Sequence, residues 1–190
     1  SPAEVLYLDD LKDFLTRQNP GLTEEEIIRL CDTVRLAGAE SDFAVLHKVY
    51  GWTVDGIAFT PQSGQAKTVQ LIDFDRPAEN IFRAVNQFSV DYVNSGQTKT
   101  RRPDIVLFVN GLPLCVISDG VKTRLGTVRT PYEHFYAWRR VNDGDKVSVT
   151  PFEETQTMIK GVYESSRFLE IYRDYIYFQD SQYDRDEREV

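Results

Sequence analysis

One stretch near the middle of the chain constrains the fold more than any other. Residues 105–109 are consecutive apolar residues, mostly β-branched or aromatic, and such a run is too short for a buried helix. It predicts a strand that is buried on both faces. Asn110 and Gly111 follow directly, and this dipeptide tolerates positive φ at both central positions of a hairpin turn. Residues 112–117 are therefore expected to return as a second strand, with Pro113 at a bulge or a free edge because proline cannot donate to a ladder.

Asp104 stands immediately before the first of these strands and just behind the basic pair Arg101 and Arg102. Spacing alone leaves two interpretations open for it. Asp104 is either a strand-start residue that caps a turn after Pro103, or a metal-binding carboxylate at the end of a sheet. Carboxylates suit hard cations such as Mg²⁺, which usually takes one or two of them and keeps several waters.

These residues together resemble a known family. Arg-Pro-Asp, an apolar strand and then Asn-Gly-Leu-Pro-Leu are similar to the N-terminal nuclease domain of the R (restriction) subunit of type I restriction enzymes. Further pieces match in the same order, namely Leu71-Ile72-Asp73-Phe74, Asn86-Gln87-Phe88, Val116-Ile117-Ser118-Asp119-Gly120 and Pro131-Tyr132-Glu133. The resemblance is collinear over most of the chain. It implies an α/β fold with a mixed central sheet flanked by helices, built on a restriction-endonuclease-like PD-(D/E)xK core.

The resemblance also implies a function. It implies Mg²⁺-dependent hydrolysis of phosphodiester bonds in double-stranded DNA, with Asp104 as the catalytic and metal-binding acid. Lys99, Arg101 and Arg102 are the residues expected to contact DNA. The methylation and specificity subunits of a restriction-modification complex are the expected partners. ATP would be used by motor domains that this chain does not contain, since no Walker A pattern is present.

The second strand departs from the family pattern. In the family it normally ends in Glu-Leu-Lys, followed by a helix and a further strand that ends in Ile-Ser-Asp-Gly. Here the positions of that Glu and Lys hold Ser118 and Gly120. Asp119 and Lys122 are three apart and would face opposite sides of a strand, so they do not replace the pair. Two strand motifs look joined, and the segment between them is either truly absent from the molecule or absent only from this sequence. The second alternative is favoured, because a parallel crossover needs a dozen or more residues and none are left. We expect the chain alone to be inactive.

Charge is distributed unevenly along the chain. The net charge of −8 argues against a general nucleic-acid coat. Residues 97–140 nevertheless hold eight basic and three acidic residues, so this window is positive within an acidic chain. A basic patch of this kind can meet phosphate locally, and the alternative is an ordinary solvated face.

The chain divides by pattern into three parts. Residues 1–50 are predicted to be an N-terminal helical segment of the same domain. Residues 51–179 are predicted to be the nuclease-like α/β core with C-terminal helices, and residues 180–190 a charged linker toward motor domains. The finer predictions are helices over 3–17, 23–34, 41–49, 155–162 and 167–172, a short hairpin over 50–59, and strands over 68–74, 86–92 and 121–128. Thr23 with Glu26 is expected to form a capping box, and Ser165 or Ser166 to cap the last helix. Gly51 and Gly56 are the turn signals of the predicted hairpin.

The remaining features set broad limits. No apolar run approaches the roughly 18 residues of a membrane span, and no charged-then-apolar leader is seen, so a cytoplasmic protein without membrane contact is expected. Cys31 and Cys115 lack metal-ligand spacing and are expected to be buried free thiols. The alternative to the endonuclease is a non-catalytic docking or DNA-binding module with a degenerate nuclease fold.

Overall fold

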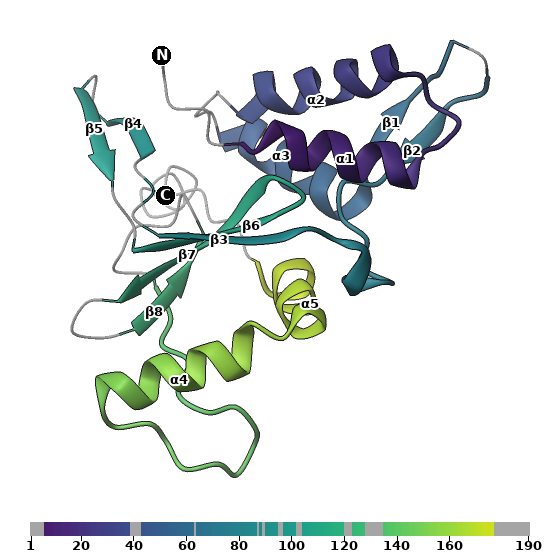
Figure 1. The fold of residues 1–190 in the computed structure, drawn as a ribbon. Helices are drawn as coiled ribbons and strands as arrows, with labels where there is room; N and C mark the ends of the chain where they lie inside the picture. The colour runs from purple at the N-terminus through teal and green to yellow at the C-terminus, as the bar shows by residue number, and fades with distance from the viewer. Residues whose placement is uncertain are drawn as a thin grey trace, which may run out of the picture.

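The computed structural model describes residues 6–38, 43–62, 64–86, 88, 90–94, 97–101, 104–119, 123–127 and 135–176 (Figure 1). Within these ranges the helices are α1 (Leu8–Gln18), α2 (Glu24–Gly38), α3 (Phe43–Asp55), α4 (Pro151–Val162) and α5 (Ser165–Tyr175), with a 3-10 turn η1 (Pro77–Glu79). The strands are β1 (Ile57–Phe59), β2 (Lys67–Val69), β3 (Phe82–Asn86), β4 (Val90–Asn94), β5 (Gln97–Arg101), β6 (Ile105–Val109), β7 (Leu112–Asp119) and β8 (Thr123–Gly126). The predicted linker over residues 180–190 lies outside the described residues.

The β6–β7 hairpin is the centre of the fold, as predicted. Asn110 and Gly111 have φ of 50° and 78°, so both central positions of the turn are left-handed. The ladder register shifts between Leu107 and Phe108, where Phe108 pairs with Pro113. The predicted hairpin and the placement of Pro113 at a bulge are both confirmed.

The main sheet has four strands in the order β3-β6-β7-β8. The α/β class with a central sheet flanked by helices is confirmed. One detail differs from the expectation of a mixed sheet, because every ladder between the described strands is antiparallel. Only three residues separate Asp119 from Thr123, which is too few for the crossover that a parallel neighbour of β7 would need.

The two faces of the main sheet have different covers. The helix-covered face carries Leu107, Val109, Cys115 and Ile117, which join the large core with α1, α2, α4 and α5. The second face carries Val106, Phe108 and Val116, which form a smaller cluster with Phe135. Tyr7 and Phe88 pack against that cluster, with their ring centroids 4.8 and 5.5 Å from the ring of Phe108. These contributions come from residues outside the described helices, and they leave Val106, Phe108 and Val116 buried.

Local signals at the predicted helix starts are largely confirmed. Thr23 and Glu26 form the expected capping box, with the Thr23 amide donating to the Glu26 carboxylate at 2.9 Å. At α5 the prediction was wrong in detail, because Glu164, and not Ser165 or Ser166, caps the helix. Its carboxylate accepts from the amides of Ser166 and Arg167.

The hairpin predicted over residues 50–59 is wrong. Helix α3 continues to Asp55, and Gly56 with φ of 85° ends it. Strand β1 then pairs with β2, which ends at Val69 rather than extending to Phe74. Among the described residues no helix is both long and apolar enough to span a bilayer.

Candidate active site

Asp104 lies at the end of the main sheet, immediately before β6, and it is exposed. Val106 follows two positions later and is fully buried on the second face. Because side chains of a strand alternate between faces, Asp104 belongs to the second face as well. The predicted catalytic acid therefore stands exposed at the end of the sheet, on the same face as Val106.

The neighbouring strand end does not complete a metal site. Ile105 pairs with Ile117, so position 118 is the neighbour of Asp104 across the ladder, and it holds a serine. Gly120 lies outside the described residues. Among the residues that the structure describes, no group of three or more His, Cys, Asp or Glu side chains could hold a metal ion. Asp104 fits one ligand position of a Mg²⁺ ion, and the described residues fall short of a full site.

The predicted DNA-binding residues are placed only in part. Lys99 and Arg101 belong to β5, where they pair with Tyr92 and Val90 of β4. The β4–β5 hairpin forms a separate two-stranded sheet and stands apart from the main one (Figure 1). Arg102 lies outside the described residues. Their role toward DNA stays a prediction.

The opposite end of β6 is fixed by a buried amide network. The Asn110 side chain, fully buried, donates to the carbonyl of Leu71 at 2.9 Å and to Oδ1 of Asn80 at 2.8 Å. Its own Oδ1 accepts from the amide of Ile81 at 2.7 Å. All its polar atoms are thus satisfied, which a buried amide requires to be stabilising. The network holds the hairpin, and with it the strand that leads to Asp104, against the loop before β3.

A second anchor joins α1 to β3. The guanidinium of Arg83 donates two hydrogen bonds of 2.8 Å to the carboxylate of Asp10 and lies 4.7 Å from the ring centroid of Tyr7. The pairing with Asp10 raises the pKa of Arg83. The two residues are 73 positions apart, so no local pattern in the sequence indicates the pair.

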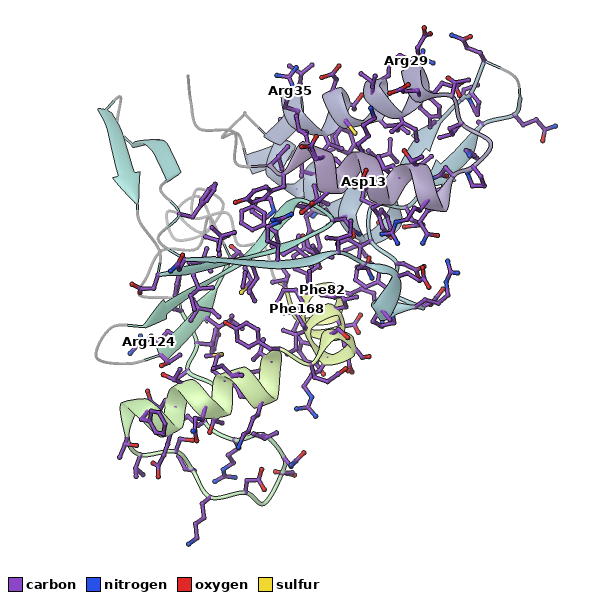
Figure 2. All side chains as sticks on the ribbon, in the orientation of Figure 1. Asp13, Arg29, Arg35, Phe82, Arg124 and Phe168 are labelled. Carbon is purple, nitrogen blue, oxygen red and sulfur yellow. The ribbon has the colours of Figure 1, made fainter. Side chains whose placement is uncertain are left out.

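An open cavity of about 360 Å³ lies between β3, β6 and the start of α5. Its walls are mainly apolar, and the rings of Phe82 and Phe168 meet there with centroids 6.5 Å apart (Figure 2). Asp104 is not among its lining residues. The cavity and the candidate acid are therefore separate features.

The two thiols are not candidates for nucleophilic chemistry. Cys31 and Cys115 are both free and buried, as expected. Burial raises the pKa of Cys31 to about 11, and it raises the pKa of the Cys115 thiol further still. Since the thiolate is the reactive form, both are inert at neutral pH.

Comparison with known proteins gives a consistent answer. Residues 1–118 match the family model described as type I restriction enzyme R protein N terminus. The putative type I restriction enzyme MjaIXP endonuclease subunit of Methanocaldococcus jannaschii is 25% identical over 214 residues, which cover 83% of this chain and 20% of that protein. The type I restriction enzyme HindI endonuclease subunit of Haemophilus influenzae is 26% identical over 221 residues, covering 92% of this chain and 20% of that protein. The chain thus spans about a fifth of the length of these relatives, and with a family match over more than half of its residues it belongs to the type I restriction enzyme R protein N-terminal family.

Proposed function

We propose that this chain is the DNA-cutting module of a type I restriction enzyme R subunit, and that the complete module hydrolyses phosphodiester bonds in double-stranded DNA with Mg²⁺. The family match carries this proposal. The exposed position of Asp104 at the end of the main sheet supports it, because a DNA backbone can reach that carboxylate. The motor domains that use ATP, and the methylation and specificity subunits, are proposed partners in a cytoplasmic enzyme, and they lie outside this chain.

Asp104 is the proposed metal ligand and catalytic acid of the module. A bound Mg²⁺ supplies positive charge that offsets the charge developing on the phosphate. The chain itself contributes one carboxylate at that point. Because positions 118 and 120 add neither a second acid nor a cation, we expect the 190-residue chain by itself to show no nuclease activity.

Two comparisons support the idea that a segment is missing beside Asp104. The family match ends at Ser118, where the pattern of the second strand departs. In addition, 83% of 190 residues is about 158 residues, yet the alignment with the Methanocaldococcus protein spans 214. The Haemophilus alignment spans 221, against about 175 residues of this chain. Both relatives therefore carry roughly fifty more positions within the matched region.

The test of the endonuclease proposal uses the whole R subunit in the assembled enzyme. Asp104→Ala is expected to abolish DNA cutting and to leave ATP-driven translocation intact, since translocation does not depend on this module. Asp143→Ala, an exposed acid in the loop before α4, is the matched control and should cut normally. Normal cutting by the Asp104→Ala enzyme would show that the assignment is wrong. Mg²⁺-dependent nicking by the purified 190-residue chain would contradict the predicted inactivity.

The second candidate function is a non-catalytic docking or DNA-binding module. Ser118 and Gly120 favour it, provided that the gap is real. Trypsin does not cleave before Pro103, so digestion should release the junction in one peptide covering residues 102–122. If the native protein yields that peptide with Ile117 continuing directly into Ser118, the segment is absent and docking is favoured. A peptide in which other residues follow Ile117 would instead support the endonuclease.

A further inference from the structure

We infer that the ribbon formed by β4 and β5 enters the major groove of duplex DNA and holds the DNA beside Asp104, an inference that rests on the proposed DNA-cutting function. The ribbon is a sheet of two antiparallel strands, and neither strand has extensive contact with another described helix or strand. Figure 1 shows it standing apart from the main sheet. A two-stranded hairpin is only marginally stable by itself in water, so this ribbon gains stability from a bound partner.

The register divides the ribbon into two chemically different faces. Alternate residues of a strand share a face, and their cross-strand partners share it too. One face therefore collects both cations and both amides of the described ribbon, through the pairs Val90–Arg101, Tyr92–Lys99 and Asn94–Gln97. The acid of the ribbon, Asp91, pairs with Thr100 and belongs to the opposite face. The first face, the cationic face, thus has the charge that attracts phosphate.

The dimensions of the ribbon select the major groove. Paired strands lie about 4.8 Å apart, and a sheet with its side chains is about 10 Å thick. The major groove is about 12 Å wide and admits a two-stranded ribbon, whereas the minor groove is only about 6 Å wide. A strand of this length extends about 14 Å, which exceeds the groove depth of about 8.5 Å. The far end of the ribbon can therefore lie inside the groove while its base stays level with the phosphates.

The order of residue types along the cationic face fits this placement. Asn94 and Gln97 form the pair at the far end, and Lys99 and Arg101 follow toward the base. A side-chain amide both donates and accepts hydrogen bonds, so it can meet the edge of any base pair in the groove. Lysine and arginine are the side chains that most often contact phosphate. The groups suited to bases thus lie at the depth of the bases, and the cations at the level of the backbone.

The base of the ribbon is tied to the candidate acid. Strand β5 ends at Arg101, and Asp104 follows three positions later. Three residues span at most about 11 Å, so a DNA backbone that contacts Arg101 passes close to the Asp104 carboxylate. All of these residues precede Ile117, so the arrangement does not depend on how the chain continues after that strand.

The first test measures binding of a labelled duplex DNA to the 190-residue chain by fluorescence anisotropy, in EDTA and at several salt concentrations. The double variant Lys99→Gln/Arg101→Gln is expected to weaken binding roughly ten- to hundredfold at low salt, and to lower the slope of log affinity against log salt by about 1.8, because two phosphate contacts are lost. The matched control is Arg139→Gln/Arg140→Gln, which removes the same charge from two exposed positions in the loop before α4 and should leave the slope unchanged. Equal losses in the two double variants would refute a specific role of the ribbon.

The second test keeps the chain unmodified and changes the DNA, so the folding of a variant does not enter. In a duplex whose cytosines all carry a glucosylated 5-hydroxymethyl group, the glucose fills the major groove and leaves the phosphates and the minor groove unaltered. The affinity of the chain for this duplex is expected to be about tenfold lower, or less, than for the unmodified duplex of the same sequence. Equal affinity for the two duplexes would refute entry into the major groove.

Cutting by the whole R subunit in the assembled enzyme separates this inference from the function on which it rests. There, Lys99→Gln/Arg101→Gln should slow DNA cutting and leave ATP-driven translocation intact. If Asp104→Ala cuts normally while the ribbon variant of the chain still loses DNA binding, the DNA-cutting proposal fails and the inference about the ribbon stands. If Asp104→Ala abolishes cutting while the ribbon variant and the glucosylated duplex bind normally, the inference about the ribbon fails alone. Absence of any salt-dependent DNA binding by the chain would refute it as well.

Discussion

The docking of α1 on the β6–β7 turn makes Gly111 highly sensitive to substitution. Its φ is +78°, and a Cβ built there would lie 2.0 Å from the carbonyl oxygen of Tyr7. The obstacle is backbone, so it cannot rotate away as a side chain can. Gly144 offers a matched comparison, because its φ is +91° and nothing lies within 4 Å of its Cβ position. Alanine at both sites has the same backbone penalty, and only Gly111→Ala adds a collision.

The expected magnitudes follow from the contacts at each site. A left-handed alanine costs about 1–2 kcal/mol, which is the whole effect expected for Gly144→Ala. Gly111→Ala must also displace Tyr7, whose amide donates to the Gly111 carbonyl at 2.9 Å. Losing that hydrogen bond costs about 1 kcal/mol. Disturbing the edge-to-face contact of Tyr7 with Phe108 adds about 1 kcal/mol. The total for Gly111→Ala is therefore about 3–4 kcal/mol.

Thermal unfolding followed by circular dichroism measures both variants directly. For a chain of this size, 1 kcal/mol lowers the melting temperature by about 2–4 °C. We expect a fall of roughly 10 °C for Gly111→Ala and of about 4 °C for Gly144→Ala. Equal destabilisation of the two variants would refute the reasoning, because it would mean that α1 does not rest on the hairpin turn as the structure shows.

Two further predictions concern titratable groups. Hydrogen bonds from the Thr23 and Gln62 amides lower the pKa of Glu26 below its ordinary 4.5, so its contribution to stability is present above that pH and is lost as pH falls through the lowered value. The free energy of unfolding should therefore differ most between the wild type and Glu26→Gln at neutral pH. Urea titrations should show this difference shrinking below about pH 4.5. A difference that stays constant with pH would contradict the capping role of Glu26. Ellman's reagent should find no reactive thiol in the folded chain and two after unfolding, because Cys31 and Cys115 are buried with raised pKa values; rapid reaction of the folded chain would be evidence against that burial.

The parts of the fold that sequence reasoning predicted are those with local causes. Asn110 and Gly111 specify their turn through their own backbone preferences, and Thr23 with Glu26 forms a cap within four residues. Asp104 was singled out by a short motif of the same kind. Each of these signals is complete within a few neighbouring positions, so it does not depend on how the rest of the chain folds.

The parts that sequence reasoning missed depend on distant partners. Gly51 and Gly56 indicated a hairpin, yet the helix runs through Gly51 because α3 is held by α5. The Tyr50 hydroxyl donates to the carbonyl of Arg173 at 3.0 Å. The Thr53 hydroxyl lies 3.0 Å from the Tyr172 hydroxyl. These contacts span about 120 positions, and tertiary packing of this kind overrides local propensity. No pattern read along the chain could have indicated them.

The same distinction separates the scaffold of this module from its chemistry. The hairpin is held at its turn end by Asn110 and by the contact between Gly111 and Tyr7, whereas Asp104 stands at the other end. The contacts that hold the turn end do not involve Asp104, so a stable chain of this sequence is no evidence that it cuts DNA. For that reason the junction peptide, which reports whether Ile117 truly continues into Ser118, separates an endonuclease from a docking module where a stability measurement cannot.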